Sequence, residues 1–139
     1  MDLQTRIPDH IQSLLRRKDR GTRIAVVGAS ANPEKYGNII VKNLSAKGYE
    51  VLPVNPREKV IEGLTVYKDV ASVPRPVHLV NFVTPPAVTL SVLQEIASQG
   101  IEAVWFQEGS DDEKVLEYAK AHFPTVIHGA CIMVVTSWL

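Results

Sequence analysis

Short apolar runs alternate along the chain with stretches of helical periodicity. Five of these runs are almost continuously apolar, whereas a strand with one face in water would alternate apolar and polar residues. They cover residues 23–28, 50–54, 77–83, 102–106 and 125–127. The pattern therefore predicts five short strands that are buried on both faces, as in a parallel sheet.

The stretches between the runs have the spacing of helices. Residues 36–47 place Ile40, Val41 and Leu44 on one face and are followed by Gly48, a natural left-handed C-cap. This segment is predicted to be a helix that directly follows the first strand and its loop.

Residues typical of helix starts and ends indicate the other helices. Apolar residues at helical spacing after Pro8 predict an amphipathic helix that ends before Gly21. Thr84 is expected as an N-cap with Pro85 at the first helical position, and Ser110 is expected to open a capping box. The predicted helices cover residues 7–20, 85–99, 110–123 and, more briefly, 69–73.

The alternation of strands and helices predicts the fold class. It indicates an α/β fold with a doubly wound, mostly parallel, five-stranded Rossmann-like sheet and helices on both faces. We expect a single domain over residues 21–139, with residues 1–20 as an amphipathic helix packed on it. Ligands of such folds bind beyond the carboxyl ends of the strands, at the point where the strand order reverses.

Composition narrows the partners. Fifteen basic and fifteen acidic residues cancel, so no overall positive field would attract nucleic acid or an anionic membrane. The N-terminal residues carry charges and lack a long apolar run, which favours a cytoplasmic protein over a secreted or membrane-spanning one.

Few residues have the spacing of a known catalytic or metal site. Cys131 is the only cysteine, which excludes an internal disulfide and favours a reducing compartment. The four histidines lack metal-ligand spacing and are expected to be structural or exposed, and no hydrolase, metalloprotease or P-loop motif occurs. No metal site and no catalytic residue is predicted.

The loop after the first strand is a candidate phosphate cradle. It runs from Gly28 through Ser30 and Pro33 to Lys35 before the next helix begins, the position at which a nucleotide-binding fold offers backbone N–H groups to a phosphate. Ser30 and Pro33 stand where the usual dinucleotide motif has its second and third glycines. A tight strand-to-helix turn without a ligand is the alternative interpretation.

The end of the second strand favours a phosphorylated ribose. NAD sites usually carry an acidic residue there, whereas this chain has Asn55, Pro56 and Arg57. That tip favours coenzyme A (CoA), with its 3′-phosphate, or NADP over NAD. A surface turn with an Arg57–Glu58 pair remains the alternative.

Two further strand ends complete the expected crevice. Pro85 and Pro86 lack N–H groups, so the tip that begins at Val83 suits apolar contact better than phosphate contact. Gln107 and Gly109 are expected to face the same crevice from the next strand. Glu108, between them, is expected to be solvated or paired with a helix dipole.

Taken together, the motifs resemble those of a known family. The segments GASANPEKYGN, GYEVLPVNPR, FVTPPAV, VWFQEG and CIMV occur in the order and spacing of the small stand-alone CoA-binding domain proteins. That family is similar to the N-terminal, CoA-binding Rossmann domain of the succinyl-CoA synthetase alpha subunit. The resemblance covers about residues 20–137. This chain departs from it at Gly129 and Ala130, where many members have Asp-Arg or Gly-Arg before the cysteine.

The resemblance implies a set of CoA contacts. The nucleotide phosphates would lie on the first loop, the adenosine end near the second strand, and the pantetheine or adenine along the third and fourth. The implied CoA-binding residues are Gly28, Ala29, Ser30, Pro33, Lys35, Tyr36, Asn55, Pro56, Arg57, Val83, Thr84, Pro85, Gln107, Gly109 and Cys131.

Three functions are compatible with these observations. The first is binding of CoA or an acyl-CoA by a small non-catalytic carrier, sensor or regulatory module. The others are an NADP- or NAD-dependent oxidoreductase, and a thiol redox or interaction protein acting through Cys131. Cys131 follows the last predicted strand and would face the CoA thiol at the crevice, or be buried within the apolar run of residues 130–135.

Overall fold

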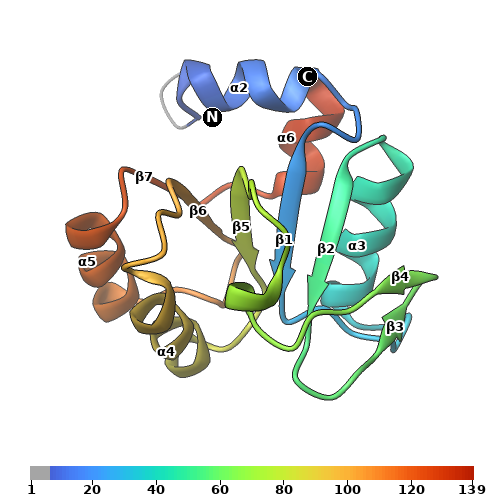
Figure 1. Cartoon of the computed structure of the whole chain (residues 1–139). Coiled ribbons are helices and arrows are strands. Elements are labelled where there is room, and N and C mark those ends of the chain that lie inside the picture. Colours follow the sequence, from blue (N-terminus) through green and yellow to red (C-terminus); the bar gives the residue numbers. More distant parts are fainter. Residues whose placement is uncertain (1–6) are drawn as a thin grey trace.

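The computed structural model describes residues 7–139 and has a parallel five-stranded sheet at its centre (Figure 1). The strand order is β2-β1-β5-β6-β7, which is the flavodoxin-like order of a doubly wound sheet. The predicted fold class is therefore confirmed. The strands are β1 (Arg23–Val27), β2 (Glu50–Val54), β5 (Leu79–Phe82), β6 (Ala103–Phe106) and β7 (Thr125–His128).

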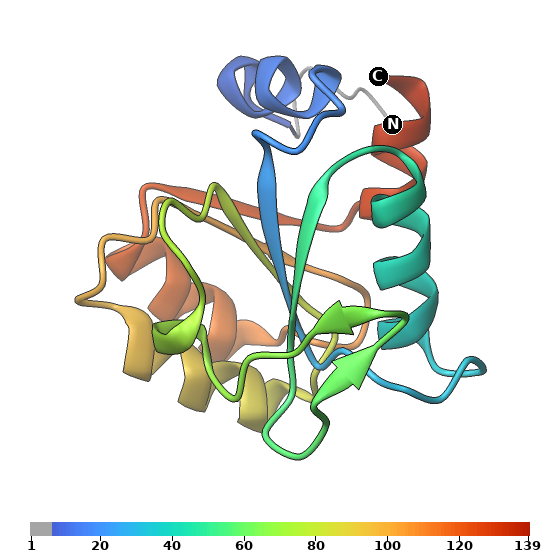
Figure 2. The ribbon, with the colours of Figure 1, turned by 45° about the vertical axis from the view of Figure 1, so that its right-hand side comes forward.

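Helices cover both faces of the sheet (Figure 2). Helices α3 (Tyr36–Ala46) and α6 (Ile132–Trp138) pack on one face, and α4 (Pro86–Ile96) and α5 (Glu113–His122) pack on the other. Helix α2 (Asp9–Arg16) lies at the edge of the sheet where the strands begin. Loops follow the carboxyl ends of the strands, and ligands of this fold class bind at that edge of the sheet.

Residues of β1 explain why the strands read as continuous apolar runs. Ile24 and Val26 belong to the core beneath α3 and α6, whereas Ala25 and Val27 belong to the core beneath α4. Because both faces are covered, the four buried positions of β1 after Arg23 are all apolar.

Several predicted boundaries were wrong. Helix α4 begins at Pro86 with Pro85 as its N-cap, so Thr84 is not the cap, and the helix ends at Ile96. Helix α5 is capped by the Asp112 carboxylate, which accepts from the Val115 N–H at 2.8 Å, and not by Ser110. Of these two helices, α5 has a side-chain cap and α4 has none. The short helix near 69–73 is a 3₁₀ turn, Val70–Ser72.

Two elements were not predicted. The first is an antiparallel hairpin of β3 (Val60–Ile61) and β4 (Leu64–Thr65), whose strands are too short for a recognisable periodicity. The second is α6, a seven-residue helix. Its β-branched residues favour extended structure, and contacts from α3 hold it: the Lys47 ammonium donates to the Met133 carbonyl at 2.7 Å and to the Thr136 hydroxyl at 2.8 Å.

The N-terminal helix is shorter than predicted. It ends at Arg16, four residues before the expected boundary at 20, and buries Ile11 and Leu15. The Tyr49 hydroxyl donates to the Leu15 carbonyl and joins the end of α2 to the sheet. Residues 1–6 of the expected segment lie outside the described residues.

His78 has a structural role at the same edge. Its Nδ1 accepts a hydrogen bond from the Arg23 backbone N–H at 3.0 Å, and burial together with Arg17 and Arg23 lowers its pKa. Within residues 7–139 no group of three or more metal-ligating side chains occurs, and no described helix is long and apolar enough to span a membrane.

Candidate functional site

The carboxyl ends of β1 and β5 meet where the strand order reverses. Gly28 leaves β1 with φ +94°, and a Cβ there would lie 2.9 Å from side-chain carbons of both Val83 and Thr84. The positive φ and the close approach both require glycine. The loop after β1 is thus held directly against the tip after β5, at the position where doubly wound folds bind ligands.

Gly37 brings α3 against the loop. A Cβ on Gly37 would lie 2.1 Å from the Gly28 carbonyl oxygen, which no side chain can tolerate. In dinucleotide-binding folds the third glycine of the motif allows this close helix–strand packing. Sequence reasoning expected that glycine at the position of Pro33 and missed Gly37. The glycine within the first turn of the helix predicted over 36–47 was the available signal.

Asn55 fastens the loop to the end of β2. Its Nδ2 donates to the Ala29 carbonyl at 2.8 Å, and its Oδ1 accepts from the backbone N–H groups of Arg57 at 2.8 Å and Glu58 at 3.1 Å. The Asn55 side chain is therefore committed to shaping two loops. Pro56 and Arg57 are exposed beside it.

Asn38 of α3 holds the loop after β1 by a hydrogen bond, and sequence reasoning did not predict it as a site residue. It is fully buried in α3, and its Nδ2 donates to the Ser30 carbonyl at 2.9 Å and to the Glu62 carboxylate at 3.1 Å. Glu62 stands in the turn of the β3–β4 hairpin, so the hairpin and the loop are joined through one amide. Within the loop, the Ser30 hydroxyl accepts from the Asn32 N–H at 3.1 Å.

The remaining predicted residues of these tips differ in exposure. Pro33 and Lys35 are exposed, and Lys35 is the N-cap of α3. Val83 is partly buried, and the Thr84 hydroxyl is hydrogen-bonded to the Thr89 hydroxyl at 2.7 Å. Pro85 is exposed at the start of α4.

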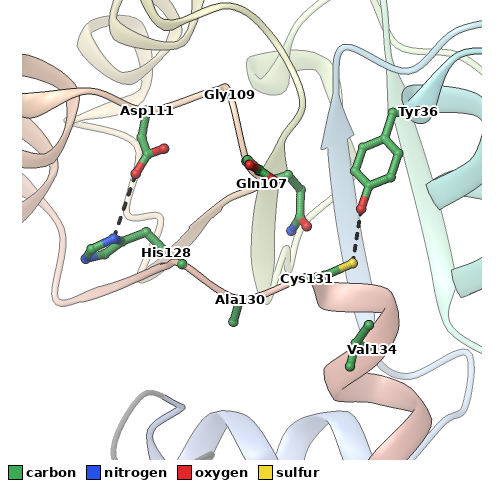
Figure 3. A pocket seen from close by; sticks show the side chains of 10 residues that line it. Tyr36, Gln107, Gly109, Asp111, His128, Ala130, Cys131 and Val134 are labelled. Carbon is green, nitrogen blue, oxygen red and sulfur yellow. Dashed lines mark hydrogen bonds and ion pairs between the residues drawn. The ribbon is translucent and has the colours of Figure 1, made fainter. Parts of the chain in front are cut away.

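A cavity of about 580 Å³ opens beside the ends of β6 and β7 (Figure 3). Its volume lies within the usual range of small-molecule sites. Four of the residues that line it were predicted, and the others come from the segments around β6, β7 and α6. Its lining consists of Tyr36, Gln107, Glu108, Gly109, Asp111, His128, Gly129, Ala130, Cys131 and Val134.

Gln107 forms part of the cavity wall, and both polar atoms of its side chain are hydrogen-bonded. It is 1% exposed, its Nε2 donates to the Asn81 Oδ1 at 2.6 Å, and its Oε1 accepts from the Ile132 N–H at 3.2 Å. The Trp105 indole N–H donates to the Ala130 carbonyl at 2.9 Å. The Gln107–Ile132 and Trp105–Ala130 hydrogen bonds join the end of β6 to the segment that leads into α6, and they position the cavity wall.

Cys131 lies on the cavity wall opposite Tyr36. The Tyr36 hydroxyl oxygen and the Cys131 sulfur form a hydrogen bond of 3.0 Å (Figure 3). Burial, the Cys131 thiol and the charge of Glu108 raise the pKa of Tyr36 to about 12, so the phenol stays protonated at neutral pH. Cys131 is partly exposed, so burial within the apolar run is wrong; α6 turns that run into a helix and leaves its first residues at the cavity.

Asp111 and His128 form a pair on the far side of the cavity. The His128 Nδ1 lies 3.8 Å from an Asp111 carboxylate oxygen (Figure 3). Sequence reasoning missed both residues as lining. Their proximity follows from the pairing of β6 with β7, which brings the loop after β6 beside the end of β7.

The sequence matches a family model described as a CoA binding domain over residues 22–137, nearly the whole chain. The chain belongs to the CoA-binding domain family. The resemblance noted from its motifs is thereby confirmed.

The chain is similar both to a subunit of a larger enzyme and to a small bacterial protein. The alpha subunit of an ADP-forming acetate–CoA ligase II of Pyrococcus furiosus is 34% identical over 78% of this chain. The chain spans only 26% of that subunit's length. An uncharacterized protein of Bacillus subtilis is 30% identical, and the match covers 83% of this chain and 85% of that protein.

Solved structures support the fold of this CoA-binding domain. A conserved hypothetical protein of Pyrococcus furiosus is 47% identical with a TM-score of 0.76, covering 81% of this chain and 97% of that one. A hypothetical protein of Pyrococcus horikoshii is 29% identical with a TM-score of 0.82, covering 94% of this chain and 90% of that one. Small proteins that are similar to this chain over most of their length thus share the architecture described above.

Proposed function

We propose that this protein binds CoA or an acyl-CoA as a small non-catalytic carrier, sensor or regulatory module. The observation that carries the proposal is the loop after β1, held at the switch point by close contacts of Gly28 and Gly37. Such a loop, followed by a helix N-terminus, is suited to the phosphates of a nucleotide. Its membership in the CoA-binding domain family supports CoA as that nucleotide.

The charged residues near the loop fit this ligand. Lys35 caps α3 beside the loop and would contact the diphosphate, and Arg57 would contact the 3′-phosphate from the tip after β2. Asn55 and Gln107 would act differently from the other predicted contacts. Because their side chains hold neighbouring segments, they would shape the site more than touch the ligand.

The remaining contacts follow the edge of the sheet. The pantetheine would pass the tip of Val83, Thr84 and Pro85 and reach the cavity lined by Tyr36 and Cys131. We propose residues 21–139 as the binding domain, with the N-terminal helix as a packed addition. A reducing, cytoplasmic setting is supported by the single free cysteine.

Calorimetric titration with CoA, NADP and NAD tests the proposal. CoA is expected to bind most tightly, because Arg57 suits a phosphorylated ribose and the end of β2 lacks the acidic residue typical of NAD sites. Tighter binding of NAD or NADP would contradict the proposal and favour the oxidoreductase alternative. Native mass spectrometry of protein purified from its host would show whether CoA is retained.

The place of Cys131 in the cavity predicts thiol exchange with CoA disulfide. The Cys131 thiolate would attack one sulfur of CoA disulfide, giving a Cys131–CoA disulfide and releasing one CoA thiolate. Intact-mass spectrometry should show one added CoA mass, which a reductant removes. The Cys131→Ser variant is the control and should show no adduct. A wild-type protein that binds CoA but gains no adduct would show that Cys131 does not face the CoA thiol.

A further inference from the structure

The cavity beside β6 and β7 is acidic. Glu108 and Asp111 line it, and none of its lining residues is lysine or arginine. The Asp111 side chain is 20% exposed, so water screens its charge only in part. The pKa of Tyr36 is raised in part by the charge of Glu108, which places that carboxylate within electrostatic reach of the phenol.

The basic residues proposed to hold phosphates do not line this cavity, although Lys35 directly precedes Tyr36, which does. Arg57 follows β2, the outermost strand on one side, and Lys35 caps the helix that follows β1. The cavity lies beyond β5, at the ends of β6 and β7. Glu34, Glu58 and Glu62 also lie in the loops over β1 and β2, so basic and acidic side chains are mixed there. The cavity lining, by contrast, carries acidic side chains and no lysine or arginine.

This difference orients an extended CoA molecule. Its nucleotide carries the phosphates and is attracted to the proposed contacts Lys35 and Arg57, whereas its pantetheine arm and thiol carry no charge. Only the uncharged end can enter the acidic cavity without repulsion. The thiol end, together with any acyl group on it, therefore occupies the cavity.

We infer that the cavity selects the acyl group: it admits free CoA and thioesters of small uncharged acids, and it disfavours thioesters that carry a second carboxylate. The inference rests on the proposed function. The physical reason is that a distal carboxylate would lie among Glu108 and Asp111 with no lysine or arginine of the lining to pair with it. Like charges placed opposite one another in this way discriminate strongly against the wrong ligand.

His128 is the one lining residue that could offset this charge, because its Nδ1 lies 3.8 Å from Asp111. Binding is therefore measured at pH 8, at which histidine side chains are generally neutral. The probes are CoA, acetyl-CoA and succinyl-CoA, which differ only at the group expected in the cavity.

The wild-type protein is expected to bind acetyl-CoA within about threefold of CoA and succinyl-CoA at least about tenfold more weakly. Glu108→Gln and Asp111→Asn should each narrow the difference between acetyl-CoA and succinyl-CoA, and the double variant should reduce it to about threefold or less. Glu113→Gln, on the exposed first turn of α5, is the matched control and should leave the difference unchanged.

The outcomes separate the inference from the proposed function. Equal binding of acetyl-CoA and succinyl-CoA by the wild type would overturn the inference and leave CoA binding intact. A difference that persists in the double variant, with CoA affinity retained, would also overturn it. Failure of every variant and of the wild type to bind CoA would overturn the proposed function itself. Because Glu108 is exposed, Glu108→Gln keeps the test valid if a variant at Asp111 does not fold.

Discussion

Replacement of Gly37 by alanine is expected to destabilise the fold by about 3 kcal/mol and to abolish CoA binding. The new Cβ would lie 2.1 Å from the Gly28 carbonyl oxygen, and that oxygen belongs to the backbone and cannot rotate away. Helix α3 would have to move off the loop. Alanine regains about 1 kcal/mol of helix propensity, which does not offset the clash. Urea unfolding measures the stability, and calorimetry measures CoA binding.

Gly100→Ala provides the matched control for Gly37→Ala. Gly100 has φ +75°, and a Cβ at this position would have no heavy atom within 4 Å. The alanine variant should therefore lose only the free energy of backbone strain, about 1–2 kcal/mol. Gly100 lies at the opposite end of the strands from the loop, so the variant should leave CoA affinity unchanged. A Gly37→Ala protein as stable as the wild type would show that α3 can shift without cost.

Removal of the proposed phosphate contacts is expected to weaken CoA binding while leaving the fold intact. Lys35→Ala and Arg57→Ala should each weaken CoA binding about 10- to 150-fold, because a hydrogen bond between charged partners contributes about 1.5–3 kcal/mol. The Arg57 backbone N–H still donates to Asn55 in the variant, so the turn should persist. Arg20→Ala is the control, because it removes a cation that pairs with Glu50 at the amino end of β2, away from the proposed site.

Titration with a second ligand, 3′-dephospho-CoA, tests whether Arg57 contacts the 3′-phosphate. With 3′-dephospho-CoA the effect of Arg57→Ala should largely vanish, because the phosphate that it would contact is absent. Lys35→Ala should weaken both ligands equally, since both retain the diphosphate. If Arg57→Ala weakens CoA and 3′-dephospho-CoA to the same extent, Arg57 does not contact the 3′-phosphate.

The local pattern of the sequence determined the sheet and the site's location. Continuous apolar runs indicate strands covered on both faces, and alternation with helices allows essentially one connection hand. The carboxyl ends of those strands must then share one edge. For this reason the sequence predicts that Gly28, Asn55, Val83 and Gln107 lie along one edge of the sheet, and of these four Gln107 lines the cavity.

Contacts between distant segments decided the rest. Residues 132–138 are too short and too rich in β-branched residues to indicate a helix, and Lys47, 86 residues before Met133, holds them in that form. The acidic cavity exists because this helix turns Cys131 toward Tyr36 while strand pairing brings Asp111 beside His128. Local propensity carries no record of such pairings, because their free energy arises only when segments remote in sequence pack together.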